Sequence, residues 1–192
     1  ARRTARVWDF ATGAVSRVLT GHRAEVIRGR FSRDGRAVIT LGADRAARVW
    51  TLGGTALVYA LAHPAGAALR AVRFSPDGRR LLTVSDPCIV WETDTGRPVA
   101  TLRAGPRTDD AVFSADGSLV LARGGGGVAL LRADGSGEVA RIPGEATDAS
   151  LSDDGRRVLT VGADRVVRLH DASNGLLVAA LGGAVGEVAG AR

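Results

Sequence analysis

A repeat of about 40 residues, made of short apolar runs separated by turns, restricts the folds open to this chain. Its most complete copy begins at Gly21-His22. The first two strand-like runs of that copy cover 26–31 and 37–41, the third ends at Trp50, and the fourth covers 57–61. Four short strands in each repeat are typical of a propeller blade. The sequence therefore predicts an all-β fold, a β-propeller of four-stranded antiparallel blades.

Equivalent positions recur at this period along the whole chain. The position of Trp50 is held in turn by Trp8, Trp50, Trp91, Leu131 and His170, and the apolar residue eleven positions later by Leu19, Leu61, Leu102, Ile142 and Leu181. An Asp-Gly pair recurs as Asp34-Gly35, Asp77-Gly78, Asp116-Gly117 and Asp154-Gly155. The Gly-Ala-Asp-Arg turn at 42–45 returns unchanged at 162–165. Several independent series at one period indicate a true repeat.

These series predict four complete blades, at 21–61, 62–102, 103–142 and 143–181. Residues 1–20 supply only the third and fourth strands of a blade, and 182–192 only the first strand of another, at Val185–Ala191. A propeller removes its edge strands by closing into a ring. We therefore expect the chain to be a segment of a larger propeller, whose remaining blades are supplied in cis or by another chain.

Three motifs resemble those of one known family. They are the Gly21-His22 pair, the Phe-Ser-x-Asp-Gly turn that begins at Phe31 or Phe74, and the strand that ends in Trp50. Trp8-Asp9 carries the dipeptide that gives this family its name. The chain resembles the WD-repeat β-propellers through these motifs, over nearly its whole length.

The resemblance implies a hydrogen-bonded network that joins His, Thr, Asp and Trp side chains across each blade. The matching residues are His22, Thr40, Asp44 and Trp50 in the second blade, His63, Thr83, Asp86 and Trp91 in the third, and Thr160 and Asp164 in the fifth. A buried indole or imidazole needs such partners. We expect this network to make the blades rigid and to carry out no chemistry.

Two blades depart from the pattern. The fourth has Gly105, Leu121, Gly125 and Leu131 at the four network positions, so we expect it to depend on apolar packing. The fifth has Glu145 in place of the His and His170 in place of the Trp. Weak copies of this kind are tolerated in repeat arrays because their neighbours support them.

Composition excludes several classes of protein. The formal net charge is +6, yet the arginines are scattered and aromatic residues make up only 4% of the chain, so nucleic-acid binding is not favoured. The single cysteine, Cys88, excludes an internal disulfide and a cysteine-based metal cluster. No apolar stretch is long enough to span a membrane. The absence of Lys and the abundance of Ala, Gly and Val suggest a GC-rich, bacterial gene, and we expect a cytoplasmic protein.

No catalytic or cofactor site is evident from the residues. His22, His63 and His170 lie in different blades and match no metal-binding spacing. The adjacent carboxylates Asp109 and Asp110 point to opposite faces of a strand and cannot share a substrate. We therefore expect no enzyme activity, cofactor or metal. Two alternatives stay open, a propeller hydrolase that uses the central channel and a nucleic-acid binder that uses the arginines.

The remaining candidate site is one rim of the propeller. The loops that enter each first strand and the loops that hold the Asp44 and Asp164 turns should share this rim. Arginines fall in these loops, at Arg23, Arg45, Arg107, Arg123 and Arg165. A positive rim suits an acidic protein partner. We therefore expect a protein–protein interaction or sensor platform, which the resemblance places in a larger signalling protein.

Overall fold

The computed structural model describes residues 3–53, 58–61, 63–64 and 68–182, and these residues form an all-β protein. They contain eighteen strands, arranged as one two-stranded sheet and four four-stranded antiparallel sheets. The prediction of four complete four-stranded blades is thus confirmed. In the two-stranded sheet, β1 (Thr4–Trp8) pairs with β2 (Val15–Thr20), which are the third and fourth strands of a blade.

Each four-stranded sheet is built from four consecutive strands in chain order. We number these blades two to five, after the partial first blade. The second blade contains β3 (Val26–Phe31), β4 (Ala37–Gly42), β5 (Ala47–Thr51) and β6 (Val58–Ala60). The third contains β7 (Ala71–Phe74), β8 (Arg80–Val84), β9 (Cys88–Glu92) and β10 (Pro98–Leu102). The fourth contains β11 (Thr108–Phe113), β12 (Leu119–Gly124), β13 (Gly127–Arg132) and β14 (Glu138–Ile142). The fifth contains β15 (Ala146–Leu151), β16 (Arg157–Gly162), β17 (Val167–Asp171) and β18 (Leu177–Leu181).

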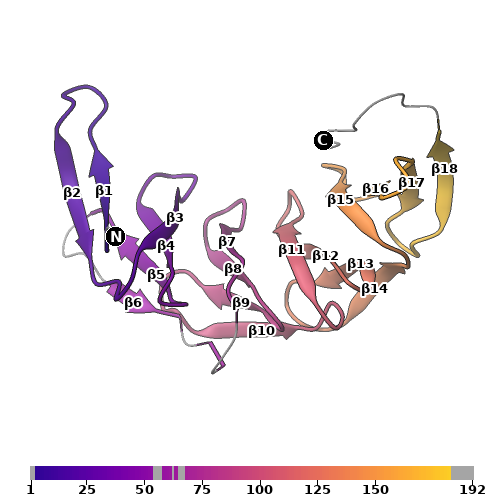
Figure 1. The fold of residues 1–192 in the computed structure, drawn as a ribbon, viewed down its shortest axis with the longest axis horizontal. Helices are drawn as coiled ribbons and strands as arrows, with labels where there is room; N and C mark the ends of the chain where they lie inside the picture. Colours follow the sequence, from indigo (N-terminus) through magenta and orange to yellow (C-terminus); the bar gives the residue numbers. More distant parts are fainter. Residues whose placement is uncertain (1–2, 54–57, 62, 65–67, 183–192) are drawn as a thin grey trace.

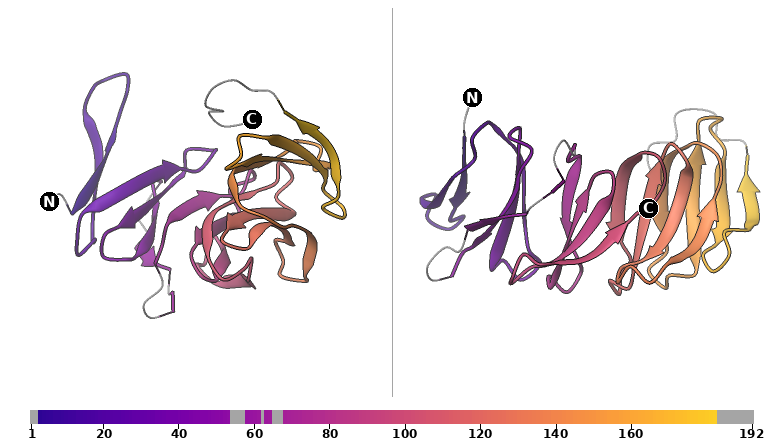
Figure 2. Two further views of the ribbon diagram at one scale, coloured as in Figure 1. Left: turned by 45° about the vertical axis from the view of Figure 1, so that its right-hand side comes forward. Right: turned by 90° about the horizontal axis from the view of Figure 1, so that it is seen from below.

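The sheets stand side by side along an open arc (Figure 1). The first strand of each blade lies on the inner side of the arc, and the fourth strand lies on the outer side. Neighbouring blades pack face to face, and β4 contacts β7, β8 contacts β11 and β12 contacts β15. Figure 2 shows the same stacking from below, with the blades following one another in chain order. This arrangement is part of a propeller ring.

The core lies between the blades and not within any one of them. One cluster joins Ile39 and Val49 of the second blade to Leu81 and Trp91 of the third. A second cluster joins the third and fourth blades, and a third joins the fourth and fifth. All six residues of β4 are buried, since both of its faces are covered by neighbouring sheets. The apolar character of both faces of these second strands is explained by this packing.

The four Asp-Gly turns share one set of hydrogen bonds. In each turn a serine hydroxyl donates to the Asp carboxylate two residues later, at 2.6 Å, as Ser114 does to Asp116. The same serine Oγ accepts the backbone N–H that opens the second strand, at 2.9 Å from Leu119 in the fourth blade. The glycine that follows has a φ of +69° to +73°, a conformation that glycine adopts without steric cost. These turns form the rim opposite to the one that carries the predicted arginines.

The two ends of the arc expose apolar side chains. Trp8, Val18, Ile27 and Phe31 are more than half exposed at one end, and Leu177, Val178 and Leu181 at the other. Two of these positions are buried in the middle of the arc, where Trp50 stands in place of Trp8 and Leu102 in place of Leu181. The strand expected at Val185–Ala191 lies outside the described residues. Among the residues that are described, no helix is long and apolar enough to cross a membrane.

Candidate functional site

The second blade carries a continuous hydrogen-bonded network. The Trp50 indole N–H donates to Thr40 Oγ1 at 2.8 Å, and Thr40 Oγ1 lies 2.7 Å from His22 Nε2. The other ring nitrogen, His22 Nδ1, lies 2.9 Å from Asp44 Oδ1. Because the carboxylate only accepts, Nδ1 carries the proton, and Nε2 therefore accepts the threonine hydroxyl. Four residues from two strands and two loops are connected in this way, as the family resemblance implies.

The Asp44 carboxylate is the acceptor that several groups of this network share. It also accepts the Arg23 backbone N–H at 2.7 Å and the Arg48 guanidinium at 2.8 Å. Burial alone would raise the pKa of Asp44, but the hydrogen bonds from Arg23, His22 and Arg48 outweigh it and hold the pKa well below its usual value. Arg48 Nη1 also lies 2.6 Å from His22 Nδ1. Two N–H groups cannot bond to each other, so we take the shared carboxylate as the acceptor for both.

The third blade keeps only half of this network. The Trp91 indole donates to Thr83 Oγ1 at 2.8 Å, and Thr83 donates to the Ile89 carbonyl at 3.1 Å. His63 lies against the Trp91 ring, with ring centroids 5.2 Å apart, and its Nδ1 is 3.4 Å from Ser85 Oγ. No partner for His63 Nε2 is found among the described residues.

Asp86 belongs to a different set of contacts from the one that the resemblance implies. Its carboxylate accepts the Thr108 backbone N–H at 2.6 Å and the Arg70 guanidinium at 2.8 Å. It therefore links the third blade to the fourth and is not bonded to His63. The physical reason is the connection from Thr83 to Trp91, which is two residues shorter than the connection from Thr40 to Trp50 that holds Asp44. The shorter loop places the carboxylate beside the next blade.

His63 makes stability depend on pH. Burial lowers the pKa of His63 to about 4, from a model-peptide value near 6.5. The unfolded chain therefore binds the proton first, so stability should fall as pH drops from about 6.5 to about 4, by at most about 1.4 kcal/mol per pH unit. Thermal unfolding measured across this range should show the loss, and a His63→Asn variant should show a flatter profile. If the stability of the variant depended on pH as strongly as that of wild type, groups other than His63 would be the cause.

The last two complete blades use different contacts at these positions. In the fourth, Leu121 and Leu131 are buried apolar residues, in keeping with the packing expected there. In the fifth, Thr160 Oγ1 lies 3.1 Å from His170 Nε2, and His170 Nδ1 lies 3.2 Å from the Gly175 carbonyl. Asp164 is bonded to Arg168 at 2.5 Å, and this side-chain hydrogen bond lowers the pKa of Asp164 to about 2. Thr160 and Asp164 thus take part in separate contacts.

Four of the five predicted rim arginines lie in loops, whereas Arg123 lies on β12, so the prediction of a loop position is wrong for Arg123. The Arg23 N–H reaches Asp44, and the Ala43 N–H donates to the Glu25 carbonyl at 2.7 Å, so the first-strand loop and the Asp44 turn share one edge. Arg23, Arg45, Arg107 and Arg165 are exposed on this rim. Arg107 is paired with Asp109 at 2.7 Å. Arg123 is half-buried, and its guanidinium donates to the Ala146 carbonyl at 3.3 Å.

Arg45 and Arg165 have an unusual backbone conformation. Their φ values are +60° and +64°, and among the described residues they are the two non-glycine positions with positive φ. This left-handed region costs a residue with a Cβ roughly 1 kcal/mol or more. The two arginines occupy the same place in the repeated Gly-Ala-Asp-Arg turn, so this strained conformation occurs twice.

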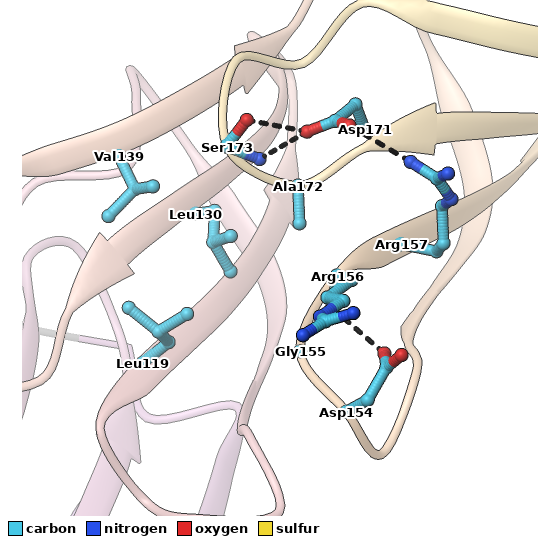
Figure 3. Close-up of a pocket in the computed structure, with 10 residues that line it drawn as sticks. All are labelled: Leu119, Leu130, Val139, Asp154, Gly155, Arg156, Arg157, Asp171, Ala172 and Ser173. Carbon is cyan, nitrogen blue, oxygen red and sulfur yellow. Dashed lines mark hydrogen bonds and ion pairs between the residues drawn. The ribbon is translucent and has the colours of Figure 1, made fainter.

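A surface hollow lies at the opposite rim, between the fourth and fifth blades. Its volume is about 590 Å³, and Leu119, Leu130 and Val139 line one side of it (Figure 3). The other side carries Arg157, which donates to Asp171 at 2.9 Å, and the exposed Arg156. The sequence analysis did not indicate this hollow, because it depends on how two blades are spaced. Within the described part of the chain, no group of three His, Cys, Asp or Glu side chains could hold a metal ion.

Two segments of the chain match the sequence model of a known protein family. The model described as WD domain, G-beta repeat matches residues 13–51 and 56–91. These two segments are WD40 repeats. The matched residues cover the second blade and most of the third, where the Thr–Trp hydrogen bond is present. The fourth and fifth blades share the same strand order and the same serine–aspartate turn.

Curated relatives are also WD-repeat proteins. The chain is 34% identical to transcription initiation factor TFIID subunit 5 of Caenorhabditis elegans over 76 residues, which are 40% of this chain and 12% of that protein. It is 26% identical to eukaryotic translation initiation factor 3 subunit I of Lodderomyces elongisporus over 182 residues, 92% of this chain and 45% of the relative. It is 26% identical to apoptotic protease-activating factor 1 of Rattus norvegicus over 134 residues, 64% of this chain and 11% of the relative. The chain therefore spans less than half the length of these relatives. WD40 repeats in such proteins suggest a protein–protein interaction scaffold.

Proposed function

We propose that this WD40 chain is a recognition platform that binds an acidic surface of a protein partner through its arginine rim. The observation that carries the proposal is the repeated left-handed conformation of Arg45 and Arg165. Both side chains are exposed on the same rim, in turns whose backbone is fixed by hydrogen bonds from Gly42 and Gly162. Strained backbone positions that recur on a rigid scaffold are candidates for function.

Electrostatics at this rim supports an acidic partner. Arg23, Arg45 and Arg165 are exposed, and the nearby carboxylates Asp44 and Asp164 are already bonded to Arg48 and Arg168. The outer arginines are therefore placed to meet carboxylates of another molecule. Complementary charge speeds association and sets the orientation of a partner.

The proposal extends to the setting of the platform. Two relatives are by name subunits of larger factors, which supports a role within an assembly. Apolar side chains on the end faces, such as Phe31 and Leu181, match the kind of surface that blades bury against one another. We therefore propose that further blades, in cis or from another chain, complete the propeller. We also propose that the platform is part of a larger signalling protein. The platform itself carries out no catalysis in this proposal.

Charge reversal at the rim tests the proposal. We expect the double variant Arg45→Glu and Arg165→Glu to bind a labelled polyglutamate peptide about tenfold or more weakly than wild type, about 1.4 kcal/mol in binding free energy. Fluorescence anisotropy measures the affinity. The matched control reverses Arg36 and Arg156, which are exposed on the opposite rim of the same two blades, and should change binding less than twofold.

The outcomes separate the competing functions. Equal loss in the two double variants would show that net charge alone governs binding and would overturn the rim assignment. Binding of a labelled single-stranded oligonucleotide in preference to the peptide, with an affinity that collapses in salt, would favour nucleic acid instead. An affinity enrichment from the native host, compared between wild type and both variants, then identifies the partner.

A further inference from the structure

The fifth blade has a cavity at the position where the second blade holds a histidine side chain. Its volume is about 400 Å³, and it lies on the arginine rim between the fourth and fifth blades. Its polar wall is formed by Glu145, Thr160, Asp164, Arg168 and His170, and its apolar wall includes Ile142. These residues occupy the repeat positions of the network in the second blade.

Comparison of the two blades shows how the cavity arises. Gly144-Glu145 stands where the second blade has Gly21-His22, and His170 stands where it has Trp50. A Cβ placed on Gly42 would lie 2.3 Å from His22 Nδ1, so the imidazole fills that space. A Cβ placed on the equivalent Gly162 would lie 2.2 Å from Asp164 Oδ1 and 2.8 Å from Arg168 Nη1, and no atom of Glu145 is among its three nearest neighbours. Because His170 is smaller than the Trp at this position in the second blade, and because Glu145 is exposed, a cavity stays open beside the Arg168 guanidinium.

Apart from the Arg168 guanidinium, which is already bonded to Asp164, the polar groups around the cavity can accept hydrogen bonds. The Gly175 carbonyl can only accept, so His170 Nδ1 carries the proton, and His170 Nε2 accepts the Thr160 hydroxyl. The lone pairs of Thr160 Oγ1 are then available. Asp164 accepts hydrogen bonds from Arg168 and from the Val166 N–H at 3.1 Å. In the second blade the equivalent carboxylate accepts two further N–H groups, from Arg23 and His22.

Charge in the cavity favours a cation. Asp164 and Glu145 are carboxylates, and the one guanidinium on the wall, Arg168, is already paired with Asp164. A group that fits must donate a proton at each end, toward Thr160 and toward Asp164. An imidazolium ring donates from both nitrogens. The two ring nitrogens of His22 span the equivalent positions between Thr40 and Asp44, although there Nε2 accepts the threonine hydroxyl.

We propose that this cavity binds the protonated histidine side chain of a partner protein, which takes the place that His22 fills in the second blade. The inference rests on the proposed function, because the cavity opens on the same rim and would recognise a part of the same partner. The inference adds the recognition of one residue type, histidine, to a rim that the proposed function describes only by its positive charge. Affinity should be higher at pH 6 than at pH 8, since the free imidazole has a pKa near 6.5. Glu145, Asp164, Arg168 and His170 are the titratable groups that face the ligand.

The test uses N-acetylhistidine methylamide as the probe and the phenylalanine analogue as a control. Amide chemical shifts of the wild-type protein should change at 145–146 and 160–170 on addition of the histidine probe. The phenylalanine analogue should leave them unchanged. A Glu145→His variant supplies its own imidazole, so we expect a higher unfolding temperature and at least a tenfold loss of probe affinity. A Glu145→Gln variant keeps the cavity open and should lose affinity only a few-fold.

A second variant keeps the inference falsifiable if Glu145→His does not fold. Asp164→Asn removes the carboxylate acceptor from an exposed side chain and should lower probe affinity at least fivefold at pH 6. Probe binding that is equal in wild type, Glu145→His and Asp164→Asn would place the imidazole elsewhere and overturn the inference. Absence of probe binding, with polyglutamate binding at the rim retained, would overturn this inference alone and leave the proposed function standing.

Discussion

Replacement of Trp50 by alanine is expected to lower the free energy of unfolding by about 3–5 kcal/mol. The Trp50 side chain is 2% exposed and packs with Leu19 and Val38 between the first and second blades. Its removal leaves a cavity at the centre of that cluster and deprives Thr40 of its indole donor. Urea unfolding of the variant and of wild type measures the difference.

The chain contains its own control for this prediction. Trp8 occupies the same repeat position, yet its side chain is 58% exposed. Trp8→Ala should therefore change stability by less than about 1 kcal/mol, because little buried surface is lost. A Trp50→Phe variant should fall between the two, at about 1–2 kcal/mol, since it keeps most of the volume and loses the N–H donor. Equal losses for Trp8→Ala and Trp50→Ala would contradict the packing described here.

The repeat made the strands predictable from the sequence. Apolar runs bounded by Asp-Gly and Gly-Ala-Asp-Arg turns correspond to β3, β4 and β5, because turn chemistry and strand periodicity are local properties. Gly13, Gly96 and Gly175, each five residues after the Trp or His of its repeat, have left-handed φ values of +66°, +67° and +76°. A glycine at these turns is a strong local signal, since other residues adopt that φ at a cost.

Properties that depend on two blades were not predictable in this way. Asp86 aligns with Asp44 by sequence, but the shorter loop places its carboxylate on the Thr108 N–H of the next blade. The difference in burial between Trp8 and Trp50 likewise depends on which sheets lie beside them. Glu145 and His170 were recognised as departures from the pattern, and they are the signal for the cavity on the rim. The sequence could not show whether neighbouring side chains fill the space.

The repeated Gly-Ala-Asp-Arg turn provides the second large effect. Asp44→Ala is expected to cost about 3–5 kcal/mol, whereas Asp164→Ala should cost less than about 1 kcal/mol. The Asp44 side chain is 7% exposed and accepts hydrogen bonds from His22, Arg48 and Arg23, which lose their acceptor together. The Asp164 side chain is 50% exposed and forms an ion pair with Arg168 that water can replace.

The pH dependence of the Asp44 variant identifies the origin of this difference. The folded state holds the pKa of Asp44 below that of the unfolded chain, so its contribution is present above about pH 4 and is lost as pH falls further. The gap in unfolding free energy between wild type and Asp44→Ala should therefore be constant from pH 5 to pH 8 and shrink in stronger acid. A gap that stays constant in acid would mean that Asp44 acts through packing and not through its charge. The Gly-Ala-Asp-Arg turns at 42–45 and 162–165 would then contribute differently to the stability of the protein for a steric reason. The hydrogen-bonded network would not be what stabilises the second blade.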